Sequence, residues 1–321
     1  MEVSINQILE KIQAADKILI TSHIHPDGDS LGSMLGLSHY LLSLGKSVLV
    51  AVEDEVPPLF HFLPGNQSIH HSNDISQLDQ YDLLIVLDTN PEIARIGEKL
   101  ASLSIPVLNI DHHLSNNRTA DYYYIDNQAA ATGEIIFQLL VLAKAEITRT
   151  IAVCLYTAIA TDCGFFRYAN TTAKTLQRAS LLVEFGAQPN EISESLEAIT
   201  LTDLTSLRDV LSTLELAADG KIAAVTLTQE ILAQDISSTD IFINYIRKII
   251  GVEIAIMYKV VDTDLVRVSL RSHGADVNQV AQEFGGGGHK RAAGCSVRGT
   301  IAAAKQQILK AAMAQLAGNQ K

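Results

Sequence analysis

The sequence contains little cysteine, which excludes a disulfide framework as the basis of its stability. Cys154, Cys163 and Cys295 are the three cysteines among 321 residues, an odd number without paired spacing. Free thiols of this kind are typical of a reducing compartment, so we expect a cytoplasmic protein. No apolar run reaches the roughly 20 residues that a membrane-spanning helix needs. The N-terminal stretch is amphipathic and contains acids, so we expect neither a signal peptide nor a membrane partner.

Basic residues are also scarce. Lysine and arginine together number 24 against 36 aspartates and glutamates, which gives a formal net charge of −12. A protein that holds long duplexes usually carries a basic face, because contacts with phosphates supply much of the affinity. If this protein acts on nucleic acid, we therefore expect short substrates, or basic residues concentrated in one pocket.

The composition is that of a globular α/β protein. Hydrophobic residues make up 47% of the chain and charged residues 19%, and the length predicts two domains. In the first half, apolar runs alternate with segments of helical spacing, which predicts a mostly parallel sheet with helices on both faces. The predicted strands are 17–22, 47–52, 82–87 and 106–110, and the predicted helices are 29–44, 132–142, 149–161 and 172–185.

A second set of predicted strands and helices begins in the last third of the chain. Residues 222–227, 252–260 and 265–270 have the composition of strands, and residues 276–284 and 300–316 have that of helices. We therefore expect a first domain over residues 1–190, a linker or connecting helix over 191–214, and a smaller α/β domain over 215–321. The active site is expected in the cleft between the two domains.

Acidic and histidine side chains follow three of the predicted strands. Ligand sites of open parallel sheets form beyond the carboxyl ends of the strands, so these side chains should meet at one edge. A further aspartate follows an apolar helix and joins the set. In chain order the residues are His23, Asp27, Asp29, Asp88, Asp111, His112, His113 and Asp162.

Carboxylates and imidazoles without thiolates are typical of manganese or magnesium sites rather than of structural zinc. Two such ions about 4 Å apart can share one carboxylate and activate a water molecule for in-line attack on phosphorus. Simpler explanations exist for single residues: Asp27 and Asp29 could cap the following helix, and a pair such as His70-His71 is usually structural. Their joint occurrence at the ends of three strands favours the metal site.

Five segments resemble the motifs of a known family. HIHPDGDSLGS (23–33), LLIVLDTN (83–90), NIDHHLSN (109–116) and TAIATDCGFFRYANT (157–171) are similar to the four motifs of the DHH phosphoesterases, in the same order. GGGGHKRAAG (285–294) resembles the signature of the DHHA1 substrate domain. The layout is similar to that of the nanoRNase and pAp phosphatase subgroup, which cleaves very short RNAs and 3′-phosphoadenosine 5′-phosphate (pAp).

The resemblance implies a site for two divalent ions, with Mn²⁺ favoured and Mg²⁺ or Co²⁺ as alternatives. His23 and Asp27 would hold the first ion, and Asp88 would bridge both ions. The residues implied for the second ion are Asp29, His112 and Asp162.

The resemblance also implies roles for two residues next to His112. Asp111 would orient an imidazole from outside the ligand set, as metal-bound histidines usually require. His113 would face the substrate phosphate as a general acid or electrostatic stabiliser. His25 has no ligand role in the family pattern.

The glycine run near the C-terminus is suited to binding an anion. Glycines lack the Cβ that would block close approach of a ligand, and successive amides can form an anion nest. Lys290 beside the run adds positive charge. A flexible hinge or tight turn is the simpler explanation. The residues that we expect to bind substrate are Arg271, Gly286, Gly287, Gly288, His289 and Arg291.

The expected function is hydrolysis of short oligoribonucleotides to mononucleotides and of pAp to AMP and phosphate. Short single-stranded RNA or DNA and small nucleotides are the expected partners. One alternative is a phosphodiesterase for cyclic di-AMP or linear pApA, whose substrates carry the same groups. Another, of a different class, is a nucleotide sensor without catalysis. The oligomeric state stays open, with a homodimer as one alternative.

Overall fold

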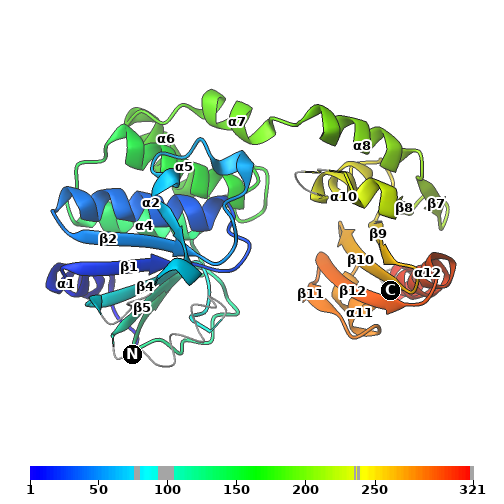
Figure 1. Cartoon of the computed structure of the whole chain (residues 1–321), viewed down its shortest axis with the longest axis horizontal. Helices are drawn as coiled ribbons and strands as arrows, with labels where there is room; N and C mark the ends of the chain where they lie inside the picture. Colours follow the sequence, from blue (N-terminus) through cyan, green and yellow to red (C-terminus); the bar gives the residue numbers. More distant parts are fainter. Residues whose placement is uncertain (76–79, 93–104, 235, 237–238, 319–321) are drawn as a thin grey trace. The chain divides into compact units, whose positions relative to one another are not determined.

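The computed structural model describes residues 1–75, 80–92, 105–234, 236 and 239–318. The chain forms two compact units, Met1–Ala198 and Ile199–Lys321 (Figure 1). The domain limits at residues 190 and 215 remain predictions. No helix in the described part of the chain is both long and apolar enough to cross a bilayer.

The first unit is built around a parallel sheet of six strands. The strands are β1 (Lys17–Thr21), β2 (Ser47–Val52), β3 (Ile69–His71), β4 (Leu83–Leu87), β5 (Val107–Asp111) and β6 (Tyr122–Ile125). They lie in the order β3-β2-β1-β4-β5-β6, and every neighbouring pair is parallel. β4 is buried along its whole length, as its continuous apolar sequence predicts. All six strands therefore end at the same edge of the sheet.

Helices flank this sheet and enclose the larger core. They are α1 (Ile5–Ala14), α2 (Gly28–Ser43), α4 (Thr132–Leu142), α5 (Arg149–Asp162), α6 (Ala173–Glu184) and α7 (Pro189–Glu197). Side chains of α1, α2, α4 and α5 pack on alternate residues of β1 and β4. The other face of the sheet carries a smaller apolar cluster around Leu19, Leu84 and Val86. This arrangement confirms the predicted α/β class.

Three glycines allow α2 and α5 to approach closely. A Cβ on Gly28 would lie 2.4 Å from the Thr161 hydroxyl oxygen, and one on Gly32 would lie 2.3 Å from the Cys154 carbonyl oxygen. A Cβ on Gly36 would lie 2.7 Å from the Leu155 side chain. The small residues at every fourth position of α2 therefore form a flat stripe on which α5 lies. This packing brings the start of α2 beside the end of α5, where an aspartate stands in each helix.

The second unit has a mixed sheet in the order β11-β12-β10-β9-β8-β7. Only β8 and β9 are parallel neighbours. The strands are β7 (Glu215–Ala217), β8 (Ile222–Leu227), β9 (Ile254–Asp262), β10 (Leu265–Ser272), β11 (Gly287–His289) and β12 (Ala292–Arg298). The helices are α8 (Leu201–Leu211), α9 (Gln229–Leu232), α10 (Asp240–Ile246), α11 (Val277–Gln282) and α12 (Ile301–Gly318). α8, α9 and α10 pack on one face, and α11 and α12 pack on the other.

Most predicted elements are present with ends displaced by one or two residues. β6, whose tyrosines are only half-buried, and α10, which is a short helix, were not expected from the sequence. The glycine run was expected to be a loop, but residues 287–289 form the edge strand β11. A strand with two glycines lacks the β-branched and aromatic residues by which strands are recognised.

Candidate metal centre

The loop after β1 turns sharply to present its acids. His25 adopts a left-handed conformation with φ of 57°, which is uncommon for a residue other than glycine. Asp54 stabilises it by accepting the His25 backbone N–H at 2.9 Å and by contacting its ring nitrogen Nδ1 at 2.5 Å. The chain then enters α2, where Asp27 accepts the Ser30 N–H at 3.0 Å as the helix cap. Asp27 therefore caps α2, which was the simpler explanation for this residue, and its carboxylate also faces His23.

The first group of ligand atoms contains His23, Asp27 and Asp88. His23 Nε2 lies 3.6 Å from Asp27 Oδ1 and 3.5 Å from Asp88 Oδ2. One ligand atom from each of the three residues lies within 4.8 Å of the others. Residues from the ends of β1 and β4 thus meet at the carboxyl edge of the sheet.

The second group contains Asp29, His112 and Asp162. His112 Nε2 lies 3.8 Å from Asp29 Oδ2 and 3.6 Å from Asp162 Oδ2, and the ligand atoms again fall within 4.8 Å of one another. The close packing of α2 on α5 brings the two aspartates together, while His112 comes from the end of β5. The structure therefore gathers all six predicted ligands into two adjacent groups.

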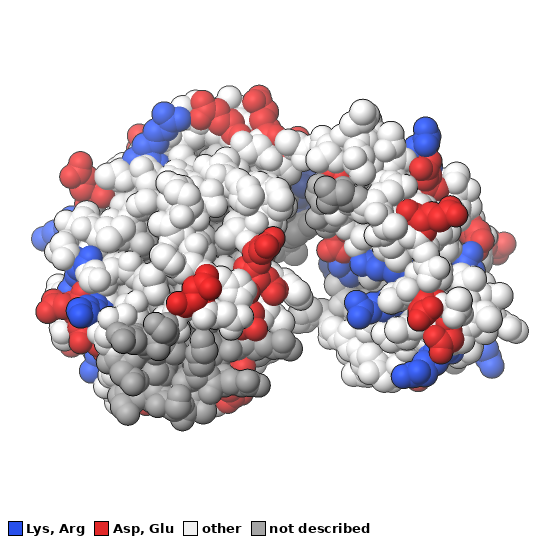
Figure 2. Space-filling model, in the orientation of Figure 1, with Lys and Arg blue, Asp and Glu red and all other residues white. Residues whose placement is uncertain are grey.

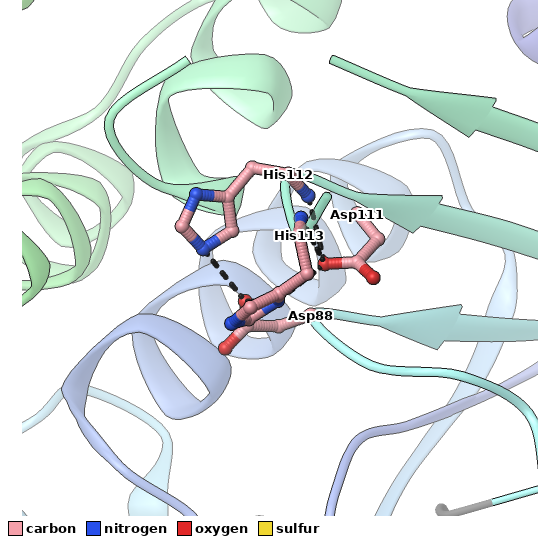
Figure 3. Close-up of side chains that lie close together, drawn as sticks. All are labelled: Asp88, Asp111, His112 and His113. Carbon is pink, nitrogen blue, oxygen red and sulfur yellow. Dashed lines mark hydrogen bonds and ion pairs between the residues drawn. The ribbon is translucent and has the colours of Figure 1, made fainter. Parts of the chain in front are cut away.

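Asp88 lies between the two groups. Its Oδ2 faces His23, and its Oδ1 lies 3.5 Å from His112 Nε2 (Figure 3). Only 3% of its surface is exposed, and its φ of 61° is left-handed, a conformation that costs about 1–3 kcal/mol outside glycine. The backbone N–H of Asp88 is held by the Ile110 carbonyl of β5 at 3.0 Å. The sheet thus holds the backbone of Asp88 in a strained conformation between the two groups.

Asp111 and His113 form a separate pair beside these groups (Figure 3). His113 Nδ1 lies 2.7 Å from Asp111 Oδ1, which also accepts the backbone N–H groups of His112 and His113. The Asn116 amide donates to Asp111 Oδ2 at 2.6 Å. Oδ1 of Asp111 thus accepts three donors and Oδ2 accepts one, and the bond to Nδ1 orients the His113 ring. Ligand atoms of Asp88, Asp111, His112 and His113 also lie within 4.8 Å of one another.

Burial and the clustering of like charges change the pKa values of these groups. Burial, and then the charge of Asp29, raises the pKa of Asp88 well above its usual range. Burial, and then the charges of Asp29 and Asp27, raises the pKa of Asp162 to about 8. Burial lowers the pKa of His23, but the carboxylates of Asp27 and Asp88 outweigh it and raise the pKa to about 11. The hydrogen bond that His113 donates to the Asp111 carboxylate raises the pKa of His113 to about 9, against the opposing effect of burial.

These carboxylates lack basic partners. Among the described residues, no lysine or arginine forms an ion pair with Asp27, Asp29, Asp88 or Asp162, and only histidines approach them. Buried like charges without cations are unfavourable unless they bind protons or metal ions. The donor set of oxygens and imidazole nitrogens fits hard divalent cations.

An open pocket of 320 Å³ gives solvent access to this cluster. Its wall includes four of the candidate ligands and the ring of His113. The lining residues are His23, Asp27, Asp88, Thr89, Asn90, His113, Ser115 and Asp162.

The sequence analysis missed the residues at the start of α4. The backbone N–H groups of Thr132 and Gly133 donate to the two oxygens of Asp29 at 2.7 and 2.9 Å. The Thr132 hydroxyl donates to Asp88 Oδ1 at 3.0 Å, and the Ala129 carbonyl lies 3.4 Å from His112 Nδ1. One short segment therefore contacts ligands of both groups. Its only sequence signal is a threonine at the start of an apolar helix, which is not specific.

Buried polar contacts fix this segment in turn. The carboxylate of Glu134, 1% exposed, accepts the Ala130 N–H at 2.8 Å and the Thr175 hydroxyl at 3.2 Å, and it forms an ion pair with Arg178. These bonds hold residues 129–134 against α6, so the donors to Asp29 and Asp88 keep their positions.

Comparison with known proteins agrees with this geometry. The model of the DHH family, N-terminal domain, matches residues 17–159, and that of the DHHA1 domain matches residues 219–318. The bifunctional oligoribonuclease and PAP phosphatase NrnA of Thermus thermophilus is 31% identical over 313 residues, covering 96% of this chain and 93% of that protein. The chain belongs to the DHH phosphoesterase family.

Two further relatives support the assignment to the DHH family. The protein of the same name from Mycoplasma genitalium is 29% identical over 301 residues, covering 92% of each chain. The crystal structure of an exopolyphosphatase-related protein from Bacteroides fragilis superposes with a TM-score of 0.88 at 28% identity, covering 96% of this chain and 94% of that one. The likeness therefore extends over both units.

The glycine run of the DHHA1 domain is shaped in part by its own sheet. A Cβ on Gly286 would lie 2.2 Å from the Gly294 carbonyl oxygen, and one on Gly288, with φ of 144°, would lie 2.5 Å from the Ala292 carbonyl oxygen. A Cβ on Gly287 would meet no atom closer than 4.0 Å. Packing of the edge strand thus accounts for Gly286 and Gly288, while Gly287 leaves open backbone.

Two of the predicted substrate residues of the DHHA1 domain share a row of the sheet. His289 pairs with Ala292 on β12, which pairs with Arg271 on β10. Arg271 Nη2 lies 3.6 Å from Asp240 Oδ1, and Arg271 Nη1 donates to the Leu270 carbonyl at 3.1 Å. His289 and Arg291 are exposed. The row therefore presents an imidazole and a guanidinium on one face of the sheet, and their roles remain predictions.

Proposed function

We propose that this DHH phosphoesterase uses two divalent metal ions to hydrolyse short oligoribonucleotides to mononucleotides and pAp to AMP and phosphate. The observation that carries the proposal is the pair of ligand groups on either side of Asp88. A single buried aspartate that faces both groups suits a bridging ligand, and two adjacent cations suit attack on phosphorus.

The ligand sets follow from the two groups. His23, Asp27 and Asp88 would hold one ion. The second would be held by Asp29, Asp88, His112 and Asp162. The absence of thiolates from both sets favours manganese, with magnesium or cobalt as alternatives. When bound, such ions activate water and stabilise the charge that develops on the phosphate oxygens.

The protein supplies the proton for the leaving oxygen. His113 faces the open pocket, and its bond to Asp111 keeps Nδ1 protonated and raises the pKa of the ring. The imidazolium can therefore donate a proton to the departing alkoxide from Nε2, while Asp111 stabilises the charged ring. Asn116 holds Asp111 from the other side, so the ring keeps its direction.

Substrate recognition would fall to the DHHA1 domain. Exposed backbone at Gly287 and the donors His289, Arg271 and Arg291 suit a phosphate and an attached base. The proposed binding residues are Arg271, Gly286, Gly287, Gly288, His289 and Arg291.

The names of the relatives from Thermus thermophilus and Mycoplasma genitalium support the choice of substrates, since both are named as oligoribonuclease and PAP phosphatase. The matches cover 96% and 92% of this chain. All three cysteines are free and buried, so we also propose a reducing compartment, the cytoplasm.

The test is a comparison of rates on pAp, a dinucleotide, cyclic di-AMP and pyrophosphate, each with manganese. We expect turnover of the first two and little of the others. Faster turnover of cyclic di-AMP would replace the proposed substrates by the alternative phosphodiesterase activity. Tight binding of nucleotides with no hydrolysis at any metal concentration would indicate a sensor.

A further inference from the structure

Among the described residues, the helices of the second unit leave part of one sheet face open. On this face α8, α9 and α10 cover β8 and β9, where Ala255 and Met257 are fully buried. Further along the same face, on β10 and β12, Arg267 and Ser296 are exposed, and Arg271 and Ser269 are half-buried. The uncovered part of the face is therefore polar and accessible.

The register of the strands arranges these side chains in rows. Lys259, Arg267 and Ser296 are directly paired across β9, β10 and β12, and so they point to the same face. Two residues along, Met257, Ser269 and Gly294 form the next row, and two further along lies the row of Arg271 and His289. Rows two residues apart are separated by roughly 7 Å. The Arg267 row thus lies on the same face as the Arg271 row already proposed to bind substrate, two rows or roughly 13 Å away.

The charges of this face are mostly of one sign. Figure 2 shows basic side chains gathered over the region where Figure 1 draws β9 and β10. Asp240 at the start of α10 forms an ion pair with Arg271, and it is the acid that acts on Lys259. Burial lowers the pKa of Lys259, and Arg267 and Arg271 add to the effect. Lys259 and Arg271 thus share the Asp240 carboxylate, and Arg267 adds a third positive charge nearby, so this part of the face suits an additional anion.

We propose that Lys259, Arg267 and Ser296 form a second phosphate subsite, which binds the phosphates of an oligonucleotide beyond its second. This inference rests on the proposed function, in which one phosphate lies at the metal centre and another at the Arg271 row. pAp and a 5′-phosphorylated dinucleotide have only two phosphates and leave the second subsite unused. Longer oligonucleotides reach it, so this row contributes to affinity only for them.

The chemistry of the three side chains suits this role. The guanidinium of Arg267 offers a planar fork of donors that matches two phosphate oxygens, and the Ser296 hydroxyl adds a neutral donor. Lys259 Nζ donates to the Thr239 hydroxyl at 2.6 Å, which keeps the ammonium close to the start of α10. Basic residues that follow the backbone without reading bases allow any short sequence to bind.

The test compares substrates of different length with the variant Arg267→Gln in the full-length enzyme. Initial rates are measured with manganese on pAp, a 5′-phosphorylated dinucleotide and a 5′-phosphorylated tetranucleotide. We expect KM for the tetranucleotide to rise about tenfold, the effect of losing one charge-assisted contact, while KM for pAp and the dinucleotide and all kcat values stay unchanged. Arg267→Lys should recover part of the loss, because it keeps the charge but not the fork.

Lys310→Gln is the matched control. Lys310 is exposed on α12, which packs on the opposite face of the same sheet, and the substitution removes the same charge. It should leave all three KM values unchanged. An equal change on all three substrates, or none on the tetranucleotide, would contradict the inference and leave the proposed function intact. A wild-type enzyme inactive on all three would overturn both.

Discussion

The two units differ in the sign of the charge that they concentrate. Residues 1–198 contain 11 basic and 24 acidic residues, and residues 199–321 contain 13 basic and 12 acidic residues, so their net charges are −13 and +1. The first unit gathers carboxylates where we propose that cations bind, and the second gathers arginines and a lysine where we propose that phosphates bind. The net charge of the whole chain conceals this division.

The units also differ in how they hold their functional side chains. In the first unit Asp29, Asp88 and Asp111 are buried and bound by backbone and side-chain donors. In the second, His289 and Arg267 stand on an open sheet face. Substitutions in the first unit should therefore affect metal binding and kcat, whereas those in the second should affect KM.

The largest effect should come from Asp88→Ala. This change removes a ligand from both groups at once, so turnover should fall by more than the roughly 10⁴-fold attributed to a general acid. Manganese binding measured by calorimetry should fall from two ions to one or none. If the variant retained both ions and most of its turnover, the division of the first unit into two groups around Asp88 would be wrong.

His113→Ala should affect catalysis without affecting the metals. Loss of the proton donor should lower kcat by about 10²–10⁴-fold, while the stoichiometry of bound manganese stays at two. His70→Ala, which removes an exposed histidine on β3, should change neither quantity. Loss of a metal ion from the His113 variant would show that this ring is a ligand.

Thr132→Val tests whether the start of α4 tunes the metal centre. The substitution keeps the shape and the N–H donated to Asp29 but removes the hydroxyl donated to Asp88. Affinity for manganese should fall about tenfold, the lower range for partners of ligands, and Thr132→Ser should restore it. Thr21→Val is the control, since the buried Thr21 hydroxyl has no hydrogen-bond partner among the residues that the structure describes. Equal affinities of the two valine variants would count against a role for Thr132.

The smallest effect should come from His289→Ala in the second unit. Loss of a contact made equally in ground and transition states raises KM and leaves kcat unchanged. We expect about a tenfold rise in KM for pAp, and none for a simple aryl phosphate, which has no distant group to bind. Equal losses on both substrates would indicate that the glycine run serves the fold instead.

The part of the candidate site that could be predicted from the sequence consists of the acidic and histidine side chains that directly follow parallel strands. Because parallel strands end at the same edge of a sheet, the sequence alone predicts that His23, Asp88 and His112 lie close together. Asp162 joined the set because it follows an apolar helix, and its role as a ligand of the second ion was implied by the resemblance to the DHH family. Its position depends on how α2 packs on α5, and spacing along the chain does not determine that packing.

Residues that support the site were missed because their signals are not specific. Asp54 follows β2 among other acids, and nothing in the sequence indicates that it holds His25 in a left-handed conformation. Thr132 acts through a backbone N–H that any residue carries and a hydroxyl found in many helices. The edge strand β11 was overlooked because glycine favours turns, although close packing against β12 requires glycine there.

Anomalous diffraction from crystals of the full chain grown with manganese tests the central claim most directly. We predict two peaks on opposite sides of the Asp88 carboxylate. One should lie among His23 and Asp27, and the other among Asp29, His112 and Asp162. A single peak, or two peaks of which neither touches Asp88, would contradict the proposed two-metal centre.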